Sequence, residues 1–108
     1  MGSKVYFADI RANSFKENKT SKIGRLFEAA DFASTVSENE LTAVKIHFGE
    51  RGGDAFINPI FVREVVDRLR SLGAKPFVTD TNTLYGGARH NSVDHLQTAI
   101  LHGFEFSV

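Results

Sequence analysis

Two segments rich in glycine and polar residues carry most of the side chains that could take part in chemistry. Residues 49–54 read Gly-Glu-Arg-Gly-Gly-Asp, and residues 80–90 combine hydroxyl, amide, phenol and charged groups. Backbone N–H groups in a glycine-rich turn before a helix can hold an anion. An arginine in the second loop could hold a carboxylate or phosphate. The candidate ligand-binding residues are Lys45, His47, Gly49, Glu50, Asp80, Thr81, Asn82, Thr83, Tyr85 and Arg89.

Lys45 and His47 are unusual because they interrupt the apolar segment before the first loop. Strand alternation places both on one face, and burying two such groups under a helix is costly without partners. One interpretation brings them toward Asp80, whose carboxylate would favour the charged lysine and could orient the imidazole. In the alternative, the strand lies at a sheet edge and Lys45 extends to water.

Neither loop matches a motif that would define its ligand. No Gly-Lys-Ser/Thr follows residues 49–54, and the dinucleotide pattern G-x-G-x-x-G is absent. This loop could instead be a flexible turn before a helix. The polar side chains of residues 80–90 could likewise serve only the backbone of their own loop. That loop is longer than most connections in compact α/β units, however, which favours a binding role.

Several other classes of protein have little support. The chain lacks a Gly-x-Ser-x-Gly segment, and His90 and His95 do not form H-E-x-x-H, so we predict neither a serine hydrolase nor a metal site. With no cysteine, the chain itself cannot hold an iron–sulfur cluster through thiolates. The 13 basic and 13 acidic residues give no reason to expect nucleic acid or an anionic membrane as a partner. Apolar runs are far shorter than the roughly 20 residues that span a bilayer, and we expect a cytoplasmic protein.

The elements that must position these loops follow from the apolar spacing. Strands are expected at residues 4–10, 41–48, 75–80 and 104–108, and helices at residues 21–33, 59–72 and 92–102. The middle helix has the clearest boundaries, with Asn58 as N-cap, Pro59 at the first helical position and Gly73 just beyond the end. Thr20 or Ser21 could cap the first helix.

The order of these elements is βαβαβαβ within a single domain covering residues 1–108. Right-handed helical crossovers between successive strands predict a mostly parallel, three-layer α/β sheet of the Rossmann-like kind. In such sheets ligands bind beyond the carboxyl ends of the strands, where both loops would lie. Because the last strand would have no helix to cover it, we expect the chain to be a fragment of a larger domain.

Four segments resemble the "uncharacterised iron–sulfur centre protein" family, also called domain of unknown function 362. They are Lys4–Asp9, Val44–Glu50, Lys75–Tyr85 and Asn91–Leu96. The resemblance implies a longer parent protein with a cysteine-rich, ferredoxin-like module that holds four-iron–four-sulfur clusters. It supplies no catalytic residues, because the reaction of the family is not established.

Two functions are consistent with these features. The chain could be the domain of an iron–sulfur redox protein that binds a small anionic or polar ligand. Alternatively, it could be a non-catalytic scaffold that positions the ferredoxin-like module or mediates oligomerisation. Its expected partners are that ligand, the C-terminal part of the parent protein and a second copy of itself, because an uncovered sheet favours association. Whether the protein is an enzyme is left open.

Overall fold

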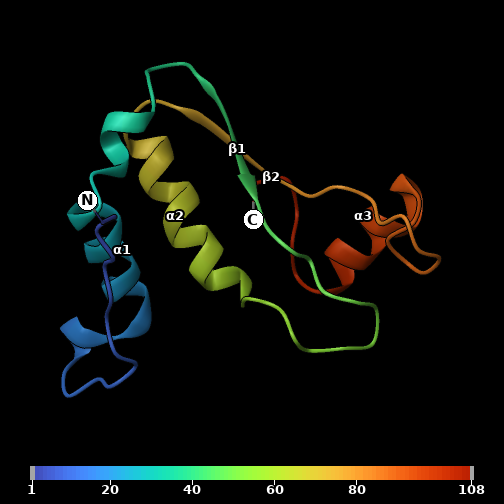
Figure 1. Ribbon diagram of the computed structural model, residues 1–108, viewed down its shortest axis with the longest axis horizontal. Helices are drawn as coiled ribbons and strands as arrows, with labels where there is room; N and C mark the ends of the chain where they lie inside the picture. Colours follow the sequence, from blue (N-terminus) through green and yellow to red (C-terminus); the bar gives the residue numbers. More distant parts are fainter. Residues whose placement is uncertain (1, 108) are drawn as a thin grey trace.

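The computed structural model describes residues 2–107, which form helices packed beside a small parallel sheet (Figure 1). Its regular elements, in chain order, are a short 3-10 helix η1 (Phe15–Glu17), α1 (Lys19–Ala29), a 3-10 helix η2 (Phe32–Thr35), β1 (Leu41–Lys45), α2 (Pro59–Ser71), β2 (Lys75–Thr79) and α3 (Ser92–Leu101). The three expected helices are therefore present, together with the two central strands.

The sheet consists of β1 and β2, which run parallel with Leu41 opposite Lys75 and Val44 opposite Val78. Helix α2 connects them and packs on β2, and α1 packs on α2 in turn. Both strands end on the same side, where the chain continues into the loops and α3 (Figure 1). The expected site thus lies at the carboxyl ends of two neighbouring strands.

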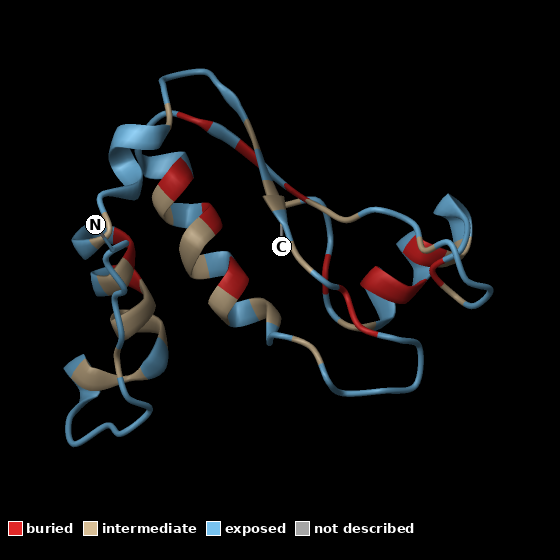
Figure 2. Ribbon diagram, viewed as in Figure 1, coloured by how far each residue is buried: buried red, intermediate tan, exposed pale blue. Residues whose placement is uncertain are grey.

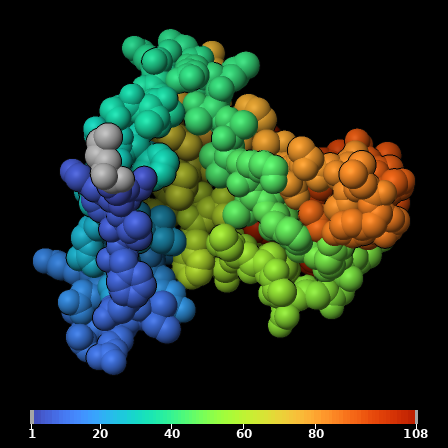
Figure 3. All heavy atoms as spheres, in the orientation of Figure 1, coloured from blue at the N-terminus to red at the C-terminus, as the bar shows by residue number. Residues whose placement is uncertain are grey.

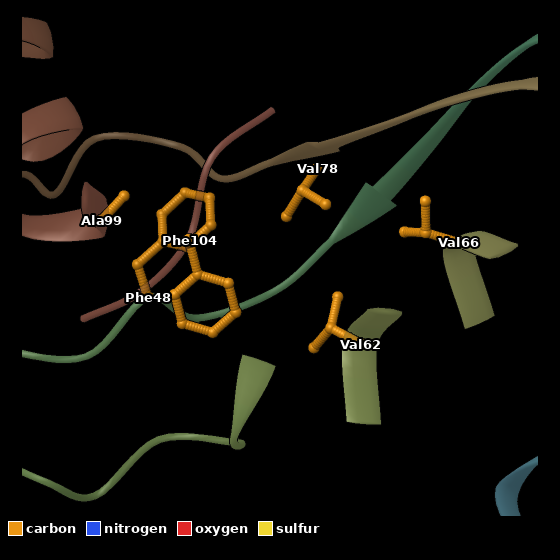
Figure 4. Packing of buried hydrophobic residues seen from close by; sticks show 6 residues of the cluster. All are labelled: Phe48, Val62, Val66, Val78, Ala99 and Phe104. Carbon is orange, nitrogen blue, oxygen red and sulfur yellow. The ribbon is translucent and has the colours of Figure 1, made fainter. Parts of the chain in front are cut away.

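Apolar side chains from five parts of the chain form one core between the sheet and the helices (Figure 4). Val62 and Val66 contribute from α2, Val78 from β2 and Ala99 from α3, and these join the rings of Phe48 and Phe104. Ring centroids of the two phenylalanines are 5.2 Å apart. Since β2 and α3 share this core, it fixes the region in which the strand ends meet α3.

Local signals place the helix boundaries. The Asn58 side chain accepts a hydrogen bond from the Ile60 N–H, and Gly73 takes the left-handed conformation (φ 84°) just beyond α2, as predicted. The first helix starts two residues before the expected position. Its cap is Asn18, whose side chain accepts from the Ser21 N–H, and neither Thr20 nor Ser21 fills that role.

Two expected strands are wrong. Residues 4–10 contain no strand, and Val5 and Phe7 are 88% and 85% exposed. Residues 104–105 have no regular structure and residues 106–107 form a turn, although the Val78 N–H donates to the Phe106 carbonyl at 2.7 Å; residue 108 of the expected strand lies outside the described residues. One such bond extends the pairing of β2 without making a strand, because a ladder needs repeated bonds.

The fold is a mixed α/β arrangement, and the sheet within residues 2–107 has two strands. Val78 belongs to the core and Val44 packs against it, whereas Leu41, Ala43 and Phe77 on the other face of the sheet are exposed. In Figure 2 the ribbon of β1 is coloured exposed or intermediate, and that of β2 includes buried residues. No described helix covers that second face. The expected three-layer arrangement is therefore not confirmed within residues 2–107.

A matched pair of substitutions tests how far the core is self-contained. Phe104 is 2% exposed and Phe106 is 73% exposed. We expect Phe104→Ala to lower the free energy of unfolding by about 3–5 kcal/mol, because the truncation leaves a cavity. Phe106→Ala should change it by less than about 0.5 kcal/mol. Urea denaturation measures both, and equal losses would contradict this core.

Candidate functional site

The carboxylate of Asp80 is the most buried charge at the ends of the strands, with its side chain 3% exposed. Asp80 directly follows β2, and Lys45 is the last residue of β1, so the parallel register brings them together. The Lys45 Nζ lies 3.2 Å from Asp80 Oδ1, which also accepts from the Thr81 N–H at 2.8 Å. The expected approach of Lys45 to Asp80 is thus present, while the lysine itself remains 66% exposed.

Arg89 brings the two loops together. Its side chain is 7% exposed, and its Nη2 lies 3.4 Å from Asp80 Oδ2. Its Nη1 donates to Glu50 Oε1 and to the Tyr85 hydroxyl, the latter at 3.2 Å. The Tyr85 hydroxyl in turn donates to the same Glu50 oxygen at 2.7 Å. One guanidinium therefore contacts residues from both loops and the end of β2.

The imidazole of His47 faces a donor on each side. Its Nδ1 accepts from the Gly49 N–H at 2.8 Å, and its Nε2 lies 2.9 Å from Arg89 Nη1. A neutral imidazole has one acceptor nitrogen, so the two donors compete for it. Asp80 makes no hydrogen bond to this ring; Arg89 contacts both, which corrects the expectation that Asp80 orients His47 directly.

His95 approaches Asp80 from α3. It is 4% exposed, its Nδ1 lies 2.9 Å from Asn82 Oδ1, and its Nε2 lies 3.6 Å from Asp80 Oδ2. The amide oxygen can only accept, so Nδ1 carries the ring proton. His95 Nε2 and Arg89 Nε are buried without a hydrogen-bond partner. Both are polar atoms that a ligand or water could satisfy.

The charges in the site shift one another's protonation. Burial would raise the pKa of Asp80, but the Thr81 N–H and the cations of Lys45 and Arg89 hold this pKa below its ordinary value. The hydrogen bond from Tyr85, followed by that from Arg89, lowers the pKa of Glu50. Both carboxylates are therefore ionised near neutral pH.

His95 is held in its neutral form. Burial lowers its pKa, and the cation of Arg89 acts in the same direction, while Asp80 opposes the shift. The net direction is downward, because desolvation penalises the charged imidazolium more than the nearby carboxylate favours it. The ring then has one N–H, directed at Asn82, and one lone pair on Nε2.

The remaining predicted residues have mainly structural contacts. The Gly49 N–H is engaged by His47, and its φ of 89° and close approach to Phe56 and His102 leave no room for a side chain. Thr83 donates its hydroxyl to the Tyr85 carbonyl, and its N–H donates to the Arg89 carbonyl. These bonds support the alternative interpretation for part of the second loop. The ligand-binding role of each candidate residue stays a prediction.

A family model, "Domain of unknown function (DUF362)", matches residues 42–108. The chain belongs to this family. The match contains every candidate ligand-binding residue, from Lys45 to Arg89. No curated protein and no solved structure is significantly similar to the chain.

Two further findings bear on this member of the family. Within residues 2–107, no group of three or more His, Asp or Glu side chains is arranged to hold a metal ion. None of the helices in the same part of the chain has the length and apolar content needed to cross a bilayer.

Sequence reasoning missed His95 as a member of the site. It considered this residue only as half of a metal motif with His90, which lies exposed on the loop. The available signal was helical spacing, because His95 precedes the core residue Ala99 by four positions and so shares its buried face. A histidine on that face beside the end of β2 marks the site.

The lowered pKa of His95 predicts pH-dependent stability. Unfolded His95 binds a proton more readily than the folded residue, so the free energy of unfolding should fall as the pH drops below about 6.5. The limit for one proton is about 1.4 kcal/mol per pH unit. Urea denaturation between pH 7.5 and 5.5 should show a reduced slope in His95→Gln. An unchanged slope in His95→Gln would contradict the assignment.

Proposed function

We propose that the chain binds a small ligand with a carboxylate or phosphate group at the ends of β1 and β2. The site is the Arg89 cluster, defined as Lys45, His47, Glu50, Asp80, Tyr85 and Arg89. The observation that carries this proposal is that Arg89 and Tyr85 already bind a carboxylate, that of Glu50. A ligand anion would take over the same donors.

Glu50 is suited to be displaced. Its side chain is 51% exposed, so it loses little packing by moving to water. Its loop contains Gly52 in the left-handed conformation (φ 86°) and Gly53 nearby, and glycine backbones adopt many conformations at low cost. A ligand anion could then contact Arg89, Tyr85 and the exposed ammonium of Lys45 together.

Asp80 would remain in place beneath the ligand. Its buried carboxylate holds both cations near the strand ends, so they are positioned before a ligand arrives. Such preorganisation reduces the entropy that binding must overcome. The unpartnered Arg89 Nε provides one further buried donor.

The resemblance of the sequence to the iron–sulfur centre proteins supports a proposal about the larger protein in which this domain acts. In this proposal the domain acts within a redox protein whose four-iron–four-sulfur clusters are bound outside this chain. The chain has no cysteine, so its own residues do not fit a thiolate-held cluster. The hydrogen bond between Val78 and Phe106 supports the related proposal that further strands complete a three-layer, Rossmann-like sheet.

Anion titration tests the binding function. Phosphate and malonate are titrated into the protein, and binding is followed by calorimetry and by two-dimensional NMR. We expect shifts in the signals of residues 45–50 and 80–90. Lys45→Met keeps the apolar stem and removes a charge-assisted contact of about 1.5–3 kcal/mol. A loss at the lower end of this energy range raises the dissociation constant of the anion about tenfold.

Two further variants sharpen the result. Lys75→Met removes the same charge from the opposite end of the sheet and should leave the affinity unchanged. Glu50→Gln removes the competing carboxylate and should strengthen anion binding. Equal loss in both lysine variants would indicate unspecific charge attraction, and weaker binding in Glu50→Gln would show that Glu50 is not the competitor.

A scaffold function is the second candidate, because the sheet face with Leu41, Ala43 and Phe77 is uncovered. Leu41 is 74% exposed, and the atoms of β1, coloured green, lie at the surface of the face seen in Figure 3. Exposed apolar faces and unpaired strand edges commonly bind other chains. We propose a second copy of this chain as the partner that covers the face.

Sedimentation equilibrium tests the scaffold candidate. The wild-type chain should be a dimer at micromolar concentration, and Leu41→Lys should convert it to the 12.0 kDa monomer. Ile60→Lys, at a 53% exposed residue of α2, is the matched control and should remain dimeric. A monomeric wild type would rule out this association.

A further inference from the structure

A cavity of about 350 Å³ borders Asp80 and His95. It is bounded by the end of β2, by α3 and by residues 104–106. Its walls are mostly apolar and include Phe48, Val78, Leu96, Ile100, Phe104 and Phe106. Binding sites for small molecules commonly have about 300–1,000 Å³ with mostly apolar walls and a few polar groups.

The polar end of this cavity is formed by Asp80, Asn82 and His95. The His95 side chain is 5% exposed, and its Nε2 has no hydrogen-bond partner. Because its Nδ1 carries the proton that faces Asn82, Nε2 presents a lone pair. A buried acceptor without a donor is costly and indicates a missing partner.

Asp80 presents a second acceptor beside the first. Its Oδ2 lies 3.6 Å from His95 Nε2 and 3.4 Å from Arg89 Nη2, so this oxygen has a cation as one neighbour and an acceptor nitrogen as another. The described residues that line the cavity include the acidic Asp80 and Glu105 and no lysine or arginine. The polar end is therefore complementary to a hydrogen-bond donor with positive charge.

We propose that this cavity binds a small amphipathic amine. The apolar body would pack against the phenylalanine and aliphatic side chains, and the ammonium would donate to His95 Nε2 and Asp80 Oδ2. An ammonium has three donors, enough for both acceptors. Water could satisfy the two acceptors but would leave the apolar walls hydrated, so it matches only one end of the cavity.

This inference does not rest on the proposed anion function. The two sites share Asp80 but differ in their other residues and in the charge they select. If the protein does not bind phosphate, the amine proposal still stands. If it does not bind the amine, the anion proposal still stands.

The experiment uses three probes with one phenyl group and similar lengths: 2-phenylethylamine, 2-phenylethanol and 3-phenylpropionate. Their dissociation constants are measured by NMR titration of the 108-residue chain, with the ring nitrogens of His95 observed directly. We expect the amine to bind at least tenfold more tightly than the carboxylate, with the alcohol between them. The Nε2 signal should shift on addition of the amine.

Two exposed positions on α3 give a matched pair of variants. Leu96 lines the cavity and Val93 does not; they are 64% and 66% exposed. Leu96→Lys places a cation at the cavity and should weaken amine binding at least fivefold. Val93→Lys has the same net charge as Leu96→Lys and places its lysine on the same helix. It should bind the amine like the wild type. Because both positions are exposed, neither variant depends on repacking the core.

The outcomes separate clearly. Selective amine binding that shifts His95 Nε2 and is lost only in Leu96→Lys supports the proposal. Failure of all three probes to bind, equal binding of the amine and the carboxylate, or equal loss in the two lysine variants would overturn it.

Discussion

The buried negative charge of Asp80 is the constraint on which the rest of the site depends. A carboxylate that is 3% exposed loses most of its hydration, and an uncompensated charge in such a place is strongly unfavourable. Compensation comes from Lys45 at the end of β1, from Arg89 in the following loop and from the Thr81 N–H. The need to compensate one charge therefore brings three separate segments to one point.

The same constraint organises loops that contain no regular structure. Arg89 Nη2 contacts Asp80, and Arg89 Nη1 donates to Glu50 and Tyr85. The loop after β1 is thereby tied to the loop after β2. Removing one partner of a buried ion pair leaves an uncompensated charge. A substitution in either loop should therefore also disturb the contacts of the other loop. The long second loop is thus a positioned part of the site.

Local sequence patterns were sufficient to predict the elements whose caps and apolar spacing lie within their own segment. The caps of α2 and the alternation of β1 predicted both the helix boundaries and the approach of Lys45 to Asp80. The segment at residues 4–10 shows the limit, because its apolar run has strand character but a strand also needs a paired neighbour. The pairing of distant segments cannot be read from local periodicity.

The site was predicted in part for the same reason. Arg89 and Glu50 were identified by residue type, but their pairing across 39 positions depends on the fold. Gly49 was identified as an anion-binding glycine, whereas its contacts with Phe56 and His102 show that close packing requires it. That requirement comes from residues that are distant in sequence, so no inspection of the loop alone would have found it.

Asp80 also links the two proposed sites in a way that follows from its contacts. One oxygen is held by Lys45 and the Thr81 N–H, while the other lies between Arg89 and His95. A ligand anion that displaces Glu50 from Arg89 would exchange one negative charge for another. The guanidinium would then keep its contact with Oδ2, so anion binding would leave the His95 side of Asp80 largely unchanged. A single ligand that carries both groups would gain from both contacts at once, because the shared carboxylate lies between them.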